Sequence, residues 1–307
     1  MSRLLSVDSG PYAPPAPARE LTAVSADGAR LHVEIHGPEA APAVVLVHGW
    51  TCSTAFWAAQ IRDLAADHRV IAYDQRGHGR SPANPACSTD TLADDLEAVL
   101  EATLAPGEQA VIAGHSMGGM TVMAASGRAA FREHAAAVLL CSTGSSQLVA
   151  ASTVVPMRPG RLRTWLTRRI LGSRAPLGPV TPLARRILKY GTMGPGSAPH
   201  MVEACARIVH ACPRGVRHTW SHVLDLLDLD HGVRELDVPT AVVVGTADRL
   251  TPPVKARALA GALPHCTGLT ELPGIGHMTP VEAPELVTGK IRELVHAHVQ
   301  VASEESA

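Results

Sequence analysis

Aromatic residues and long hydrophobic runs are what this sequence has least of. Only 3% of its 307 residues are Phe, Trp or Tyr although 46% are hydrophobic, so Ala, Val and Leu must fill any core. No run approaches the ~18 apolar residues of a membrane span, so no integral membrane segment is expected. The first residues also lack the apolar centre of a secretory signal, and we therefore expect a cytoplasmic protein.

Cysteine spacing and net charge argue against two further classes of function. The six cysteines form no Cys-x-x-Cys pair and no histidine-spaced cluster, so neither a metal site nor a redox motif is indicated. A formal net charge of −1 provides no overall attraction for nucleic acid. We expect no metal, no cofactor and no nucleic-acid partner, and the sequence leaves the oligomeric state open.

The most informative stretch runs from Val111 to Met120, where an apolar run meets Gly-His-Ser-Met-Gly and an alanine-rich segment follows. This order predicts a strand, a tight turn at Ser116 and a helix. Gly114 and Gly118 let the strand and the helix approach closely. The helix N-terminus then points its N–H groups and dipole at the serine, which suits a developing oxyanion. Glycine-rich turns produce this pattern by chance, so the flanking strand and helix are what favour catalysis.

Short aliphatic runs alternate with helix-like segments along most of the chain. The runs are typical of strands buried in a parallel sheet, and an Asp-Gly turn between two further segments predicts an antiparallel edge hairpin. The hairpin segments are residues 20–25 and 30–36, and the runs are 43–47, 69–73, 111–113, 137–141, 240–244 and 268–272. Together they predict an α/β fold with a doubly wound, mostly parallel sheet of eight strands.

The alternation stops at residues 145–232, where Pro, Gly and Arg separate short helical segments. We expect these residues to form a helical cap inserted after the sixth strand. The α/β core is then made of residues 21–144 and 233–299. Residues 1–20 are rich in proline and have no apolar period, which indicates a disordered or loosely draped leader, and residues 300–307 form a tail.

The first part of the expected cap is strongly basic, because residues 145–202 hold nine Arg and Lys residues and no Asp or Glu. Two apolar stripes at helical spacing run through it. They are Leu162, Trp165, Leu166 and Ile170 in one, and Leu183, Ile187 and Leu188 in the other. We predict that both stripes face the body of the protein while the arginines face water or that body, which is acidic. A weak interfacial contact or a bound anionic ligand is the alternative.

Two polar loops follow early strands. In His48-Gly49-Trp50 the glycine lets the backbone turn, so that the N–H of Trp50 can donate to an oxyanion. Core packing of the Trp50 ring is the alternative. In the loop 74–81, Asp74 or His78 could act in catalysis, but we predict that Asp74 pairs with Arg76 and that the loop is structural.

A serine hydroxyl needs a base before it can attack a carbonyl, and the base needs a group that orients it. Among the 16 histidines, His277 lies in a glycine-rich loop between the last strand and the last helix. Asp248 is the carboxylate that follows a late buried strand. The chain order Ser116, Asp248, His277 is the order expected of a catalytic triad on such a sheet.

These motifs together resemble the α/β-hydrolase family in its capped form, over about residues 21–299. The resemblance rests on the glycine-flanked Ser116, the His-Gly-Trp loop, the loop 74–81 and the segments around Asp248 and His277. It implies that Ser116 is the nucleophile, that His277 is the general base and then acid, and that Asp248 is its partner. It also implies an oxyanion hole formed by the N–H groups of Trp50 and Met117.

Departures from related branches narrow the implied reaction. Serine at the turn argues against relatives that open epoxides or cleave carbon–halogen bonds through aspartate, and the His-Gly-Gly-Gly loop of many lipases is absent. The resemblance implies a serine hydrolase that cleaves an apolar carboxylic ester, a monoacylglycerol-like ester or a lactone through an acyl-enzyme. The alternatives are a carbon–carbon bond hydrolase, a thioesterase, a perhydrolase or a non-catalytic ligand-binding scaffold.

Overall fold

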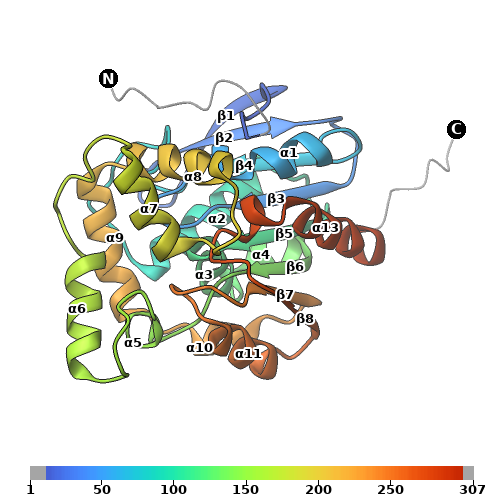
Figure 1. Ribbon diagram of the computed structural model, residues 1–307. Coiled ribbons are helices and arrows are strands. Elements are labelled where there is room, and N and C mark those ends of the chain that lie inside the picture. Colours follow the sequence, from blue (N-terminus) through green and yellow to red (C-terminus); the bar gives the residue numbers. More distant parts are fainter. Residues whose placement is uncertain (1–11, 300–307) are drawn as a thin grey trace, which may run out of the picture.

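A computed structural model describes residues 12–299 of the chain. Its centre is one sheet in the spatial order β1-β2-β4-β3-β5-β6-β7-β8 (Figure 1). The strands are β1 (Arg19–Val24), β2 (Arg30–His36), β3 (Ala43–Val47), β4 (Arg69–Tyr73), β5 (Ala110–His115), β6 (Ala135–Cys141), β7 (Thr240–Gly245) and β8 (Cys266–Leu272). β2 is antiparallel to both of its neighbours and every other adjacent pair is parallel, which confirms the predicted sheet.

Helices cover both faces of this sheet (Figure 1). Side chains alternate along β3, so Val44 and Leu46 join one apolar core while Val45 and Val47 join the other. The first face carries η1 (Thr54–Trp57), α1 (Ala58–Leu64) and α13 (Pro284–His298), and the second carries α2 (Thr89–Thr103), α3 (Met117–Ala125), α4 (Ala129–His134) and α11 (Pro253–Ala262). The sheet is therefore doubly wound, because strands that are apolar on both faces need a helical layer on each.

A helical segment separates β6 from β7. It contains α5 (Leu148–Ala151), α6 (Arg161–Leu171), α7 (Pro182–Thr192), α8 (Pro199–Ala211), α9 (Arg214–Leu226) and α10 (Asp230–Glu235). We call α5 to α9 the cap helices, and in Figure 1 they gather at one end of the sheet. α8 joins one core through Val202 and Ile208, and α9 joins the other through Val216 and Trp220. Because α6 packs on α5 and α9, and α7 packs on α8, α6 and α7 form an outer layer.

Most residues of the apolar stripes of α6 and α7 are not covered by the body, so this prediction is wrong for all but Leu166 and Leu188. Their large side chains are between 52% and 67% exposed at Leu162, Trp165, Ile170, Leu183 and Ile187, while Leu166 and Leu188 are half-buried. The inward face of α6 is polar instead, with Arg163 and Thr167 buried. The Arg163 guanidinium donates to the carbonyl of Ala150 at 2.7 Å. Helical spacing shows which residues share a face but not which face becomes covered.

The chain ends differ partly from the predicted leader and tail. Residues 1–11 and 300–307 lie outside the described residues. Tyr12 is buried, and its hydroxyl donates to the carbonyl of Val281 at 3.1 Å. β1 begins at Arg19, one residue before the predicted hairpin segment and inside the predicted leader. Between residues 12 and 299, no helix combines the length and the apolar character needed to cross a membrane.

Candidate active site

Ser116 stands at the turn between β5 and α3, as the sequence predicted. Its backbone has φ 52° and ψ −117°, a conformation that costs a non-glycine residue about 1–3 kcal/mol. A Cβ atom on Gly114 would come within 2.6 Å of the carbonyl oxygen of Gly118, and one on Gly118 would come within 2.0 Å of the Val47 carbonyl oxygen. Only glycine at these two positions lets the strand, the turn and the helix approach so closely.

Asp248 and His277 are brought together from the ends of neighbouring strands. Asp248 follows β7, His277 lies in the loop after β8, and Nδ1 of His277 is 2.8 Å from Oδ2 of Asp248. Both side chains are buried. The other carboxylate oxygen of Asp248 accepts the N–H groups of Leu250 at 2.8 Å and Thr251 at 2.9 Å. The carboxylate is therefore held on both oxygens and presents a fixed acceptor to the imidazole.

Thr251 makes a contact to this pair that the sequence reasoning missed. Its Oγ1 lies 2.8 Å from Oδ2 of Asp248 and 3.2 Å from Nδ1 of His277. The same hydroxyl is 2.8 Å from the carbonyl oxygen of Ser142 at the end of β6. No periodic signal marks this threonine, although its place three residues after Asp248 puts it within one turn of the carboxylate.

The loop that carries His277 is held by a second buried acid. The carboxylate of Glu282, at the end of α12 (Thr279–Glu282), accepts the N–H groups of Gly276 at 3.1 Å and Met278 at 3.2 Å. It also accepts the N–H of Gly194 at 2.7 Å and the hydroxyl of Ser197 at 2.6 Å. One side chain thus joins both neighbours of His277 to the segment between α7 and α8. The sequence carries no signal for this role.

Two further contacts fix the main chain of His277. Its N–H donates to the carbonyl of Thr192, the last residue of α7, at 2.8 Å. Its carbonyl oxygen lies 2.9 Å from Nε2 of His115, the residue before Ser116. Burial lowers the pKa of His115 well below its ordinary value, so this ring is neutral and Nε2 carries the hydrogen. The loops of Ser116 and His277 are therefore hydrogen-bonded to each other.

The backbone segments that carry the N–H groups of Trp50 and Met117 both adjoin Ser116. A Cβ atom on Gly49 would be 3.1 Å from Cβ of Ser116, so the loop before Trp50 passes against the serine. Met117 is the first residue of α3, and its N–H has no intrahelical acceptor. Neither N–H donates to any acceptor within residues 12–299. The Trp50 ring is half-buried and its Nε1 donates to the carbonyl of Arg217 at 3.2 Å.

Neutral histidines shape the loop that contains Trp50. Burial lowers the pKa of His48 to about 3 and that of His78 to about 4. Nε2 of His48 accepts the N–H of Gln75 at 3.0 Å, and Nε2 of His78 accepts the N–H of Thr51 at 3.2 Å. The Gln75 side chain donates to the His48 carbonyl and accepts the hydroxyl of Thr121 on α3 at 2.8 Å. His48 and Gln75 were not predicted to have these roles.

The predicted ion pair between Asp74 and Arg76 does not form. Asp74 is buried and accepts the N–H groups of Thr54 and Arg80, each at 2.8 Å. Arg76 instead donates through Nε to Asp95 of α2 at 2.8 Å and through Nη1 to Asp27 at 2.7 Å. The two side chains leave the loop in different directions because each meets partners from distant elements. Both side chains are therefore held by hydrogen bonds, and a structural role of the loop stays a prediction.

Ser116 and His277 line the same cavity of about 560 Å³. Much of its wall is apolar and comes from the cap helices and the α6–α7 connection, including Ile170, Leu177 and Leu188. A second cavity of about 60 Å³ also reaches Ser116 and is lined by Met120, Leu148, Val149 and Leu224, among others. Ser116 therefore faces one large and one small apolar space.

One group of side chains in the described region has the spacing of metal ligands. Glu20, His32 and Glu34 place their ligand atoms within 4.8 Å of one another on β1 and β2. Both carboxylate oxygens of Glu20 are bound to Arg80, at 2.6 and 2.9 Å, and His32 bonds to Glu34 at 3.1 Å. These groups already have partners and do not line the cavity at Ser116.

Comparison with known proteins places this geometry in a family. The sequence pattern of the alpha/beta hydrolase fold matches residues 42–284. A non-heme chloroperoxidase of Streptomyces lividans is 28% identical over 87% of this chain and 96% of its own length. The structure of a thermophilic esterase from Thermogutta terrifontis is 26% identical with a TM-score of 0.73, over 91% of this chain and 99% of that chain.

Other relatives match over a shorter stretch. A 3-oxoadipate enol-lactonase of Acinetobacter baylyi is 36% identical over 96 residues, which are 31% of this chain and 35% of that protein. The chain matches about a third of the length of several such curated relatives. The family pattern, by contrast, spans the sheet from β3 to the start of α13 and includes Ser116, Asp248 and His277. The chain therefore belongs to the alpha/beta hydrolase fold family.

Proposed function

We propose that this protein is a serine hydrolase that cleaves a largely apolar carboxylic ester, a monoacylglycerol-like ester or a lactone, through an acyl-enzyme. The observation that carries the proposal is the 2.8 Å contact between Asp248 and His277, in a site where His277 and the strained Ser116 line one apolar cavity. Relatives named esterase and enol-lactonase support an ester-type substrate.

In this mechanism Ser116 Oγ attacks the ester carbonyl while Nε2 of His277 takes its proton. Asp248 holds Nδ1–H of His277, so the imidazole is oriented and its charged form is stabilised. The N–H groups of Trp50 and Met117 donate to the tetrahedral oxyanion. His277 then returns the proton to the leaving alcohol, and water releases the acid by the same steps.

A fluorophosphonate probe tests the nucleophile. We expect the wild type to be labelled and Ser116→Ala to remain unlabelled. Ser173→Ala is the matched control, because Ser173 lines the same cavity but does not lie at the turn between β5 and α3. Labelling of Ser116→Ala, or a folded wild type that is never labelled, would contradict the proposal, and the second result would favour a ligand-binding scaffold.

A panel of p-nitrophenyl esters tests the substrate class. Each buried methylene contributes about 0.8 kcal/mol, so kcat/KM should rise from acetyl to about hexanoyl as the cavity fills. Thioesters, lactones, a peracid-forming reaction and a vinylogous diketone belong in the same panel. Faster turnover of the diketone than of every ester would assign carbon–carbon bond cleavage instead.

A further inference from the structure

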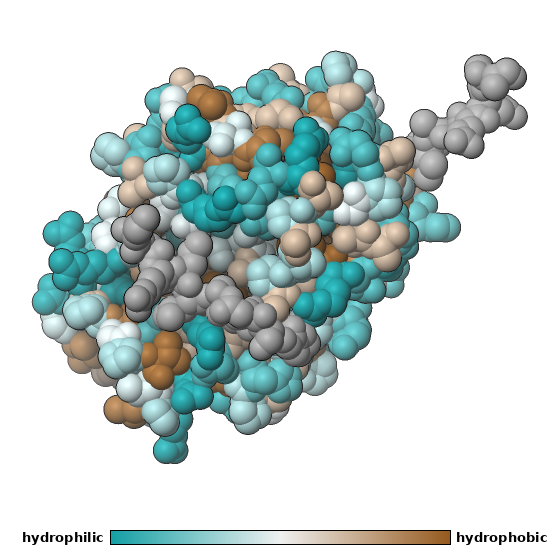
Figure 2. Space-filling model, turned by 90° about the horizontal axis from the view of Figure 1, so that it is seen from above, coloured by the Kyte–Doolittle hydropathy of each residue, from teal (hydrophilic) through white to brown (hydrophobic). Residues whose placement is uncertain are grey.

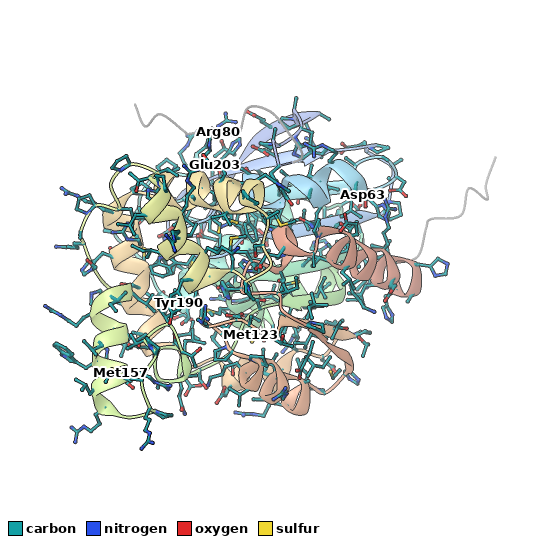
Figure 3. The ribbon with its side chains drawn as sticks, viewed as in Figure 1. Asp63, Arg80, Met123, Met157, Tyr190 and Glu203 are labelled. Atoms are coloured by element: carbon teal, nitrogen blue, oxygen red, sulfur yellow. The ribbon has the colours of Figure 1, made fainter. Side chains whose placement is uncertain are left out.

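The segment from Met157 to Tyr190, which includes α6 and α7, carries most of the large apolar side chains that the described region exposes. Eight of the twelve such residues within residues 12–299 lie between Met157 and Tyr190. They are Met157, Leu162, Trp165, Ile170, Leu177, Leu183, Ile187 and Tyr190, which we call the outer cap face. Figure 3 shows Met157 beside α6 and Tyr190 on α7, and Figure 2 shows hydrophobic groups among hydrophilic ones on that side of the molecule. Soluble proteins usually scatter exposed apolar residues singly.

The backbone of this face is fixed in its orientation. α6 is anchored through its polar side, where Arg163 is buried and bonds to Ala150. The end of α7 is held by Arg249, whose guanidinium donates to the Tyr190 carbonyl and lies 4.2 Å from the centre of the Tyr190 ring. Both helices are therefore held by polar contacts while the apolar side chains of this face stay exposed.

The charge of the outer cap face is positive. Residues 145–202 contain nine basic residues and no acid. Arg168 pairs with Asp225 and Arg185 pairs with Glu203, both at 2.6 Å. No ion pair with a carboxylate of the described chain is formed by Arg158, Arg161, Arg174 or Arg186, all of which are exposed. Apolar side chains flanked by such arginines are typical of surfaces that lie on anionic lipid.

We propose that the outer cap face docks on an anionic lipid surface. Charge decides between this partner and a second copy of the chain. A symmetric dimer through this face would place its unpaired arginines against the same arginines of the other copy, and like charges repel. An anionic bilayer accepts the leucine, isoleucine and tryptophan side chains into its interface and neutralises the arginines together.

The face also adjoins the entrance of the large cavity. Ile170 and Leu177 belong to the outer cap face and to the wall of the cavity that contains Ser116. Docking therefore brings the lipid surface to the cavity. Entry of an apolar ester directly from the bilayer rests on the function proposed above, whereas the docking itself does not.

Vesicle flotation tests the docking without any activity measurement. We expect binding to phosphatidylglycerol–phosphatidylcholine vesicles, at least ~10-fold weaker binding to phosphatidylcholine alone, and loss of binding at high salt. Trp165 is the reporter, because Trp57 and Trp220 are fully buried and Trp50 is half-buried. Its emission should shift to shorter wavelength with the anionic vesicles and be quenched by a brominated lipid.

A double variant, Leu162→Ser with Ile187→Ser, should reduce anionic-vesicle binding at least ~10-fold. Leu286→Ser is the matched control, because Leu286 is an exposed leucine on α13, outside the outer cap face. Equal binding of these two variants, equal binding to neutral and anionic vesicles, or an unchanged Trp165 spectrum would overturn the proposal. So would a dimer in sedimentation that the double variant converts to monomers, because the face would then belong to a second copy. Probe labelling of Ser116 is measured separately, so failure of docking and failure of catalysis are distinguishable.

Discussion

Replacing Glu282 by glutamine tests how far catalysis depends on the buried acid behind His277. The change keeps the shape of the side chain and removes one acceptor oxygen. The carboxylate serves four donors, at distances of 2.6 to 3.2 Å, from Ser197 and the N–H groups of Gly194, Gly276 and Met278. A glutamine side chain has one carbonyl oxygen, which can accept hydrogen bonds only from the donors on its own side. Its NH₂ group then faces the remaining N–H groups and cannot accept from them.

The expected loss of stability and of turnover depends on which hydrogen-bond donors remain unpaired in Glu282→Gln. If the amide oxygen keeps the bonds to Gly194 and Ser197, the N–H of Met278 loses its acceptor. One unsatisfied buried donor costs about 1–3 kcal/mol. Met278 directly follows His277, so the unpaired N–H lies in the loop that positions the imidazole. A displacement of about 1 Å in such a loop lowers turnover by roughly 10²-fold.

Urea denaturation measures the loss of stability, and ester kinetics measure the loss of turnover, in the same preparation. Glu282→Gln should lower the free energy of unfolding by about 1–3 kcal/mol and reduce kcat more than it raises KM. Glu285→Gln is the control, because Glu285 is an exposed acid at the start of α13. If both variants are as stable and as active as the wild type, Glu282 does not hold the His277 loop.

Three further outcomes are expected. Ser116→Ala and His277→Ala should each reduce turnover by at least ~10³-fold in steady-state assays, and the double variant should be no worse than either, because triad members act as a unit. Gly118→Ala should lower the free energy of unfolding in urea by ~3 kcal/mol or more, since its methyl group would come within 2.0 Å of a carbonyl oxygen of β3. Urea denaturation should show lower stability at pH 5 than at pH 7, with His48 and His78 each contributing a loss of about 2 kcal/mol. Burial lowers their pKa in the folded state to about 3 and about 4, so below pH 6.5 the unfolded chain binds protons that the folded chain does not. Asp74, whose pKa burial raises to about 6, offsets a smaller part of this loss because the folded chain binds a proton there first. Stability that is unchanged or greater at pH 5 would contradict this reasoning.

The positions of the strands and of the three candidate catalytic residues could be predicted from the sequence alone. Val44 to Val47 and Val242 to Val244 are apolar at every position, and only a strand covered on both faces buries all of them. The turn at Ser116 needs glycine at fixed offsets because neighbouring backbone would collide with a Cβ atom. These constraints act over a few residues, so a local pattern is sufficient to reveal them.

Partners from distant elements could not be predicted in this way. The sequence shows that Asp74 and Arg76 are close along the chain, but Asp74 meets backbone N–H groups of a helix start and its own loop while Arg76 meets acids on α2 and in the β1–β2 turn. Glu282 reaches both neighbours of His277 and the segment after α7 for the same reason. Which side chains satisfy a buried charge is decided by tertiary contacts.

The cap helices also show the difference between what local sequence patterns predict and what tertiary contacts decide. Periodicity correctly grouped Leu162, Trp165 and Ile170 on one side of α6 and Leu183 and Ile187 on one side of α7, but it did not indicate which side would be covered. Hydrophobic spacing is a property of a single helix, whereas burial depends on what packs against it. The sequence by itself determined the fold class and the order of the candidate triad. Only the tertiary structure decided that the apolar side of the outer cap helices faces outward.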